Sequence, residues 1–275
     1  MRSARARPGW FTRVFVHGVS GWVTLLTYLF MLVPIVILVA FAFNAGKSTV
    51  VWTGFSLGWF EKVWHNRNIA RALHVSLVVA LGSAALSTAI GALAAVAITR
   101  REFPGRDLLG AALAAPLVLP EIVLGVGLLV FMSFAGVPLG YGSMIVGHVL
   151  VSIPFATLIV RAAAASLDVR LEDAAADLGA NEWQTFRLVT LPQLMPAIAT
   201  AFLLSATLSF DNLVMSTFTS GVGTTTLPLR IYSMLKLGIT PEINALGALM
   251  VVANVAILLL VMGRYLPLML KPNRR

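Results

Sequence analysis

The sequence contains no cysteine among its 275 residues. This absence excludes disulfide bonds, thiolate metal sites and a cysteine nucleophile. Charged residues are scarce as well, at 11% of the chain, whereas soluble globular domains carry about a quarter. Hydrophobic residues make up 59%. The composition therefore predicts an integral membrane protein.

Six apolar stretches are long enough to cross a bilayer, which takes roughly 20 mainly apolar residues. They cover residues 22–43, 73–98, 108–133, 141–161, 194–215 and 245–267. No small-residue cleavage site follows the basic N-terminus, so we expect the first stretch to be a retained anchor rather than a removed signal peptide. The sequence thus predicts an all-α membrane protein with six transmembrane helices.

The spans divide the chain into a cytoplasmic N-terminal segment, 1–21, a first transmembrane helix, 22–43, a core of five helices, 73–267, and a cytoplasmic tail, 268–275. The second span is rich in Ala, Gly and Ser, which allow close backbone contact between helices in lipid. We therefore expect this span inside the helix bundle. The alternative is an Ala-rich helix that faces lipid.

The formal net charge is +9, which would suit either a nucleic-acid partner or a membrane protein with basic loops on one side. Six spans place both termini on the same side, and most of the 20 Lys and Arg residues then fall on that side. Basic residues collect in the cytoplasmic loops of membrane proteins. The distribution of Lys and Arg therefore indicates that both termini are cytoplasmic, and no nucleic-acid partner is expected.

The longest cytoplasmic connection, 162–193, carries the polar segment LEDAAADLGANEWQTFRLVTLPQLMPAI, which continues into the fifth span. Its alanines, with acids near the start, predict a helix over Asp173–Leu178. Gly179 is expected to stop this helix, because glycine tolerates the left-handed conformation found at helix ends.

A second short helix is predicted from about Asn181, as its N-cap, to Val189. Leu191-Pro192 is expected to end it and to restart the chain toward the membrane. Such a segment could rest on lipid headgroups, but helices that do so usually carry Lys and Arg on the polar face. Because acids dominate here, a protein partner is favoured.

The spacing of this segment resembles the EAA loop of ABC-type importer permeases. In that family Glu-Ala-Ala is followed by three residues, Gly, nine residues, Ile, one residue and Leu-Pro. The matching positions here are Asp173-Ala174-Ala175, Gly179, Val189 and Leu191-Pro192, with Asp in place of Glu and Val in place of Ile. The resemblance implies a type I permease fold whose first short helix is a coupling helix that docks on a cytoplasmic ATPase. The residues it implies in coupling are Glu172, Asp173, Ala174, Ala175, Asp177, Leu178, Gly179 and Ala180.

The resemblance also implies partners outside this chain: a second homologous permease subunit in a heterodimer, two ATPase subunits and an extracytoplasmic substrate-binding protein. ATP and Mg would be bound by the ATPase, and no cofactor by this chain. The stretch GKST at 46–49 ends like a phosphate-binding loop, but Phe41 stands where that motif needs Gly. The four His residues are scattered and are expected to be interfacial or packed, so no metal site is predicted.

Two acidic residues lie at membrane depth, where ionisable side chains are costly and usually functional. Glu121, after Pro120, falls near the middle of the third span, roughly 20 Å from either end at 1.5 Å per residue. It lines a substrate path, or it is a protonated or paired packing group. Asp211, in the outer third of the fifth span, faces an outer vestibule or caps a local break. Two such acids suit a cationic substrate, and Phe210 and Tyr232 could hold alkylammonium groups by cation–π contact.

The stretch from Ser209 to Leu246 is similar to the spermidine/putrescine branch of these permeases, in which Phe-Asp-Asp is followed by a Leu-Pro and a TPEINAL-like run. Asn212 stands where that branch commonly has its second Asp. The resemblance implies a transport subunit, not an enzyme, that sits in membrane lipid and moves putrescine or spermidine across a bacterial inner membrane by alternating access. The alternatives are a permease for another small solute or, in a different class, an ATPase-independent channel or secondary transporter.

Overall fold

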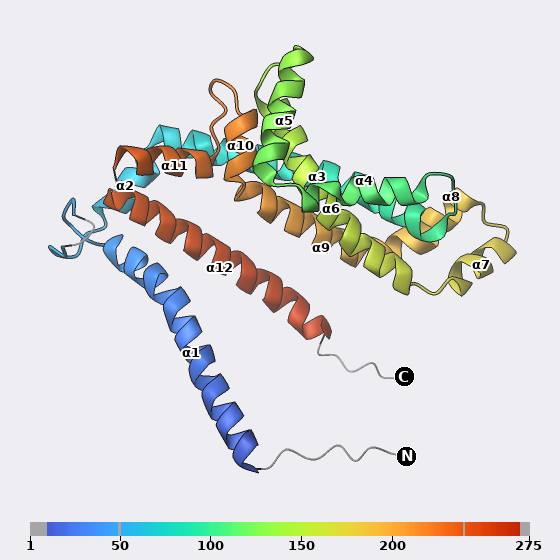
Figure 1. The fold of residues 1–275 in the computed structure, drawn as a ribbon, viewed down its shortest axis with the longest axis horizontal. Coiled ribbons are helices and arrows are strands. Elements are labelled where there is room, and N and C mark those ends of the chain that lie inside the picture. The colour runs from blue at the N-terminus through green and yellow to red at the C-terminus, as the bar shows by residue number, and fades with distance from the viewer. Residues whose placement is uncertain (1–9, 49–50, 239, 270–275) are drawn as a thin grey trace. The chain divides into compact units, whose positions relative to one another are not determined.

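The computed structural model describes residues 10–48, 51–238 and 240–269 (Figure 1). Its helices are α1 (Trp10–Phe41), α2 (Gly58–His65), α3 (Arg67–Arg100), α4 (Arg106–Val118), α5 (Glu121–Phe134), α6 (Tyr141–Ser166), α7 (Arg170–Asp177), α8 (Glu182–Thr185), the π-helical turn η1 (Phe186–Thr190), α9 (Leu191–Phe210), α10 (Leu213–Thr219), α11 (Leu227–Leu237) and α12 (Pro241–Met269). Apart from an isolated bridge between Asn44 and Phe55, the described residues form helices and the turns that join them. The all-α fold predicted from the sequence is confirmed.

The described residues up to Asn66 and from Met234 onward form one compact unit. Helix α12 packs against α1 and α2. Gly247 permits the contact with α1, because a Cβ there would come within 3.1 Å of Leu38 Cδ2. Asn66, which follows α2, donates from Nδ2 to Glu242 Oε1 in the first turn of α12 at 2.9 Å.

The second unit, Arg67–Ser233, has its core where α3, α6 and α9 pack against one another (Figure 1). Gly91 of α3 allows the close approach of α6, because an added Cβ would lie 2.9 Å from Ala156 Cβ and 3.0 Å from the Thr157 backbone nitrogen. The second predicted span is therefore inside the bundle, as expected: 39% of its apolar window is buried, against 0% for the window of α1. The fully buried apolar side chains of this core are Ala95, Ala156, Val160, Ala164, Leu194 and Ala201.

Four described helices are long and apolar enough to cross a membrane: Ser20–Phe41 of α1, all of α3, all of α6 and the continuous run Glu182–Phe210. The bent pair α4–α5 adds a fifth span if the pair is counted as one. The sixth expected span, 245–267, falls within α12, of which Pro241–Ala256 is an apolar helix.

The expected continuous helix over 108–133 is wrong, because α4 and α5 meet at 111°. Leu119 and Pro120 form the break. A proline disfavours the helical conformation in the residue before it, and Leu119 is extended, with ψ 136°. The break moves Glu121 from the expected middle of a helix to the first residue of α5.

Candidate functional site

Helix α7 and the turn after it form a closed local structure. Gly179 follows α7 at φ +84°, the left-handed conformation that favours glycine at a helix end. Its nitrogen donates to Ala176 O at 2.9 Å, and the next nitrogen, of Ala180, donates to Ala175 O at 3.0 Å. These two bonds are the Schellman pattern that satisfies the last carbonyls of a helix. The predicted helix and its stop at Gly179 are confirmed.

The second short helix begins at Asn181, as predicted. Asn181 Oδ1 accepts from the Gln184 backbone nitrogen at 2.9 Å, and Gln184 Oε1 accepts from the Asn181 nitrogen at 2.8 Å. The helix does not end at Leu191-Pro192, so that prediction is wrong. It runs on through η1, in which the Leu191 nitrogen donates to Phe186 O, and becomes α9. The proline falls in the first turn of α9, where a residue without an N–H is tolerated.

Glu172 ties α7 to two neighbouring elements. Its Oε1 accepts from Thr190 Oγ1 at 2.9 Å and lies 3.5 Å from Arg100 Nε at the end of α3. Arg100 also donates from Nη2 to Leu167 O, just after α6. The Arg100 and Glu172 side chains are only 14% and 23% exposed. This three-residue contact, Arg100–Glu172–Thr190, is called the Glu172 brace below.

A second ion pair joins the residue after α3 to α8. Arg101 Nη2 lies 2.6 Å from Glu182 Oε2, and these side chains are 58% and 79% exposed. The hydrogen bond and the charge of Glu182 raise the pKa of Arg101 above its usual value. Both short helices are therefore linked to the end of α3, one through a shielded pair and one through a pair in open solvent.

Most of the remaining side chains of the α7–α8 segment are exposed. Leu178, at the end of α7, is 89% exposed, and Trp183 on α8 is 66% exposed. The Trp183 ring lies 5.7 Å from the half-buried Phe186 ring. Of the residues expected to couple, Ala175 and Ala180 are partly buried like Glu172, whereas Asp173, Ala174, Asp177, Leu178 and Gly179 are exposed. The segment thus presents an acidic and apolar surface, and Glu172 attaches it to Arg100 and Thr190.

The second polar region lies at the break between α4 and α5. Glu121 Oε1 accepts a hydrogen bond from Asn212 Nδ2 at 2.5 Å. The other end of the same amide, Asn212 Oδ1, accepts from the Met215 backbone nitrogen at 2.8 Å and so caps α10. One asparagine therefore closes the start of α10 and pairs with the carboxylate at the start of α5.

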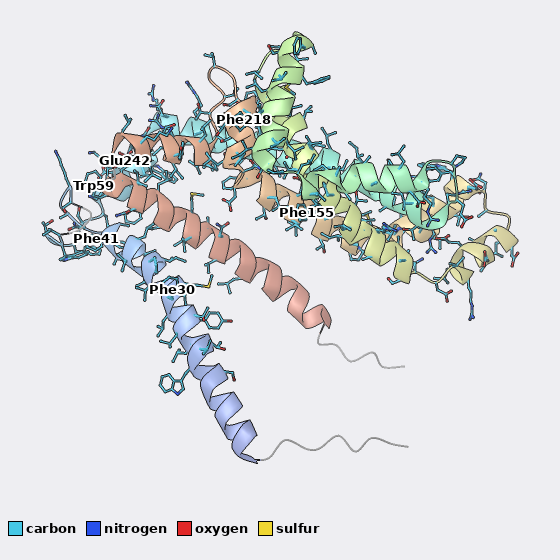
Figure 2. All side chains as sticks on the ribbon, in the orientation of Figure 1. Phe30, Phe41, Trp59, Phe155, Phe218 and Glu242 are labelled. Carbon is cyan, nitrogen blue, oxygen red and sulfur yellow. The ribbon has the colours of Figure 1, made fainter. Side chains whose placement is uncertain are left out.

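Helices α5 and α10 pack together because Gly125 of α5 leaves room for Phe218 of α10, which is labelled in Figure 2. A Cβ at Gly125 would lie only 2.5 Å from Phe218 Cδ2. On the α6 side, Ser143 Oγ donates to Thr219 O at 2.8 Å. These contacts fix α10 against its neighbours and hold Asn212 over Glu121.

The other predicted path residues differ in where they lie. Phe210 is the half-buried last residue of α9, and Asp211 is the exposed residue that caps α9 before Asn212. A break in the helix follows Asp211, and the expectation that Asp211 faces an outer vestibule stays a prediction. Tyr232 is on the separate helix α11 and is 41% exposed. The structure joins Glu121 to Asn212 by a hydrogen bond, and Phe210 and Asp211 accompany Asn212 in the same turn.

Sequence reasoning missed a buried group beside this turn. His148 of α6 is 1% exposed and contacts Ser209 Oγ through Nδ1 at 2.7 Å and Ser216 Oγ through Nε2 at 3.2 Å. Ser209 Oγ in turn accepts from Ser83 Oγ of α3 at 2.8 Å. The expectation of a packed histidine is confirmed for His148. A histidine in an apolar span was the available signal, but its two partners come from two other helices, α9 and α10.

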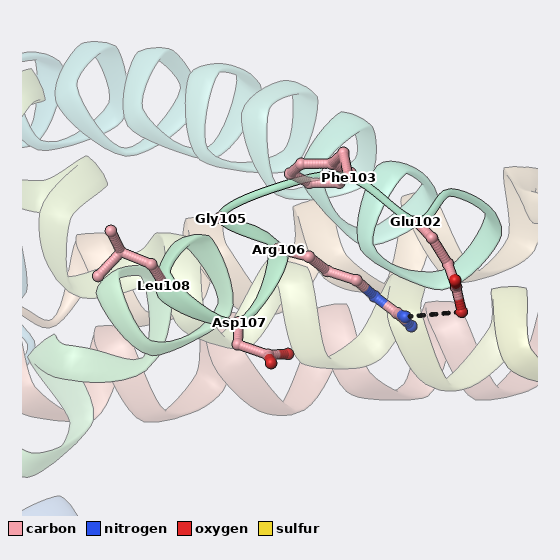
Figure 3. A pocket seen from close by; sticks show the side chains of 6 residues that line it. All are labelled: Glu102, Phe103, Gly105, Arg106, Asp107 and Leu108. Carbon is pink, nitrogen blue, oxygen red and sulfur yellow. Dashed lines mark ion pairs between the residues drawn. The ribbon is translucent and has the colours of Figure 1, made fainter.

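One hollow opens at the turn between α3 and α4, with a volume of about 290 Å³ (Figure 3). It is lined by Glu102, Phe103, Gly105, Arg106, Asp107 and Leu108. Arg106 and Glu102 form an ion pair across it at 3.9 Å. It contains none of the predicted path residues. Within the described part of the chain, no three His, Asp or Glu residues gather as metal ligands.

The fold and these two regions define a multi-span helical membrane protein with a polar segment of two short helices tied to the end of α3 and a carboxylate at a helix break. Residues 9–267 match the family of binding-protein-dependent transport system inner membrane components, and the chain belongs to that family. It is therefore a multi-pass inner-membrane permease subunit of an ABC importer, a transport component rather than an enzyme. The resemblance inferred from the sequence is confirmed.

Relatives cover most of the chain. It is 37% identical over 233 residues to the spermidine/putrescine transport system permease protein PotC of Haemophilus influenzae. This match covers 85% of this chain and 91% of the relative. It is 35% identical over 240 residues to the putrescine transport system permease protein PotI of Escherichia coli K12, covering 84% and 85%.

The fold is shared with a chain of a bacterial ABC transporter involved in the import of the acidic polysaccharide alginate. The TM-score is 0.71 at 18% sequence identity, and the match covers 94% of this chain and 99% of that chain. At that identity the likeness concerns the fold alone.

Proposed function

We propose that this chain moves a polyamine, putrescine or spermidine, through the membrane by alternating access, driven by a separate ATPase. The observation that carries the proposal is the half-buried Glu121 carboxylate at the α4–α5 break, paired with a neutral amide instead of a cation. The names of the two relatives described above support the substrate class.

The chemistry of Glu121 suits an alkylammonium group. Asn212 occupies Oε1, while Oε2 has no hydrogen-bond partner among the described residues. A carboxylate in an apolar setting is costly until a cation pairs with it. Asp211, next to Asn212 and exposed, supplies a second negative charge on the same turn. A molecule with two separated ammonium groups could therefore meet one carboxylate after the other.

The α7–α8 segment is proposed to be the coupling segment, which docks on the ATPase through its exposed surface around Leu178. Movement of the segment would reach α3 through the Glu172 brace and the Arg101–Glu182 pair. It would reach α9 directly, because α8, η1 and α9 form one continuous helix. The far end of α9 carries Asp211, so the same helix joins the proposed docking surface to the proposed substrate path.

The proposed assembly contains a second homologous permease, two ATPase subunits that hold ATP and Mg, and an extracytoplasmic substrate-binding protein. This chain would bind no cofactor. Both termini and the α7–α8 segment would be cytoplasmic, as the distribution of Lys and Arg predicts.

The test is uptake of labelled putrescine, spermidine and an unrelated neutral solute by the reconstituted complex. ATP-dependent uptake of a polyamine, and not of the neutral solute, is expected. Uptake of another solute alone would contradict the assignment of a polyamine as the substrate, but not the conclusion that the protein is an importer subunit. A stable, transport-active form with no ATPase bound would overturn the coupling assignment.

A further inference from the structure

His148 lies at the centre of a hydrogen-bonded chain that crosses four helices. The chain starts at Ser83 on α3, passes through Ser209 at the end of α9 and His148 on α6, and reaches Ser216 on α10. Ser216 Oγ then donates to the backbone carbonyl of Asn212 at 2.7 Å. All four side chains are at most 4% exposed. The chain therefore ends on the residue that pairs with Glu121.

The proton of each group can be assigned from the shortest contacts. Ser83 donates to Ser209 at 2.8 Å in preference to Ala80 O at 3.2 Å, and Ser216 donates to the Asn212 carbonyl. Each hydroxyl has one proton, so Ser216, which donates to the Asn212 carbonyl, is left to accept from Nε2–H of His148. In the neutral ring Nδ1 then accepts from Ser209. Every polar side-chain atom of Ser83, Ser209, His148 and Ser216 has a hydrogen-bond partner, as buried polar groups require.

The two partners of His148 stand on opposite sides of one helix break. Ser209 belongs to the last turn of α9, and Ser216 to the first turns of α10. The break between the two helices consists of Asp211 and Asn212. A rigid ring that bonds both serines fixes the distance across the break, and with it the backbone of Asn212.

We propose that His148 is a positioning residue: by bridging Ser209 and Ser216 it sets the Asn212 amide against the Glu121 carboxylate and so tunes substrate affinity. The inference rests on the proposed function, because affinity is the property it concerns. His148 itself touches neither carboxylate. Its effect passes through Ser216 and the Asn212 carbonyl.

The first test compares two substitutions of similar volume. His148→Gln keeps an amide that reaches Ser216, whereas His148→Leu fills the space with no hydrogen bond. We expect His148→Leu to raise the half-saturating polyamine concentration roughly tenfold, because both hydrogen bonds of the bridge are lost, with little change in the rate at saturation. His148→Gln should stay within about threefold of the wild type, since one bond is kept. Equal behaviour of the two variants would overturn the proposal.

A double-mutant cycle separates positioning from packing. In an Asn212→Ala background the amide that His148 positions is gone, so His148→Leu should raise the half-saturating concentration no further. Additive effects would contradict the proposal. Ser152→Ala, one helical turn away on α6 and equally buried, is the control and should leave affinity unchanged.

A third measurement does not depend on transport. The chain has no cysteine, so the Glu121→Cys/Asn212→Cys double variant offers one thiol pair to a short bifunctional crosslinker. Adding His148→Leu should slow crosslinking several-fold, and adding His148→Gln should not. Equal rates would overturn the positioning role even if polyamine uptake is observed. Absence of polyamine uptake by the wild type would instead overturn the proposed function and leave this result standing.

Discussion

Helix α9 begins in a region held by charges and ends in a region held by neutral groups. At its start, Thr190 contacts Glu172, which pairs with Arg100, and the nearby Arg101–Glu182 pair is open to solvent. At its end, Ser209, His148, Ser216 and Asn212 form a hydrogen-bonded chain that leads to the single carboxylate of Glu121. An ion pair that stays in water has a small desolvation cost. In a membrane core, burying hydrogen-bonded hydroxyl, imidazole and amide groups costs less free energy than burying charged groups. Among the described residues, Glu121 is therefore left without a cationic partner.

The largest effect is expected at the surface of the α7–α8 segment that is proposed to dock on the ATPase. Leu178→Asp places a charge on a side chain that is 89% exposed, so folding should be preserved while docking of the ATPase is disrupted. We expect ATP-dependent uptake to be abolished and the ATPase to be lost on co-purification.

The matched control for Leu178→Asp is Leu237→Asp, at a leucine that is 92% exposed at the end of α11. It should retain the ATPase on co-purification. If both variants keep the ATPase and Leu178→Asp imports normally, Leu178 is not part of the docking surface.

The neutral region can be tested with two Asn–Glu pairs of the same chemistry. Glu121 accepts from Asn212, and Glu242 accepts from Asn66 at 2.9 Å. In each case a Gln can still accept from the Asn amide, so only the charge is lost. Glu121→Gln should lower polyamine uptake at subsaturating concentration roughly tenfold or more, the effect of a lost charge-assisted hydrogen bond to substrate.

Glu242→Gln is the control for that measurement and should import at close to the wild-type rate. Equal losses in both variants would show that a carboxylate is needed for folding rather than for the path. Unchanged uptake in Glu121→Gln would remove Glu121 from the substrate path.

The charged region was largely predictable from the sequence because its signals are local. Gly179 needs only its own backbone conformation, and Asn181 needs only the backbone nitrogen of Gln184. The continuation through Leu191-Pro192 was not predictable, since a proline ends a helix at one position and begins one at another. The π-helical turn that joins the two helices has no sequence signature of its own.

The neutral region was only half predictable. The acids at Glu121 and Asp211 stood out because apolar spans rarely contain them. The break at Leu119-Pro120 was not predicted, because the apolar residues on both sides of it form one stretch long enough for a single span. The hydrogen bond from Asn212 and the bridge by His148 depend on α5, α6, α9 and α10 meeting, and the order of residues in the chain does not state which helices meet.

A smaller effect is expected from the shielded ion pair of the charged region. Arg100→Ala removes the partner of a Glu172 side chain that is 23% exposed. An unpaired, partly buried acid costs about 1–3 kcal/mol, so the midpoint of thermal unfolding in detergent should fall. Uptake should fall by less than in Leu178→Asp, because Thr190 still holds Glu172.

Arg161→Ala, at an exposed arginine of α6, is the control for Arg100→Ala and should leave the midpoint unchanged. Equal midpoints in the two variants would mean that the Glu172 brace contributes nothing to stability. A fall in Arg100→Ala that is rescued by adding Glu172→Gln would assign the cost to the unpaired acid.

The smallest effect is expected from the neighbouring exposed pair. Arg101→Ala breaks a contact of 2.6 Å that is shorter than the Arg100–Glu172 contact of 3.5 Å, so distance alone would rank it as the stronger pair. Both of its side chains are largely in solvent, where water and salt screen the attraction. We expect almost no change in the unfolding midpoint at low salt and none at 1 M salt, where the screening length falls to about 3 Å. A larger fall than in Arg100→Ala would show that distance, and not burial, decides how firmly the α7–α8 segment is tied to α3.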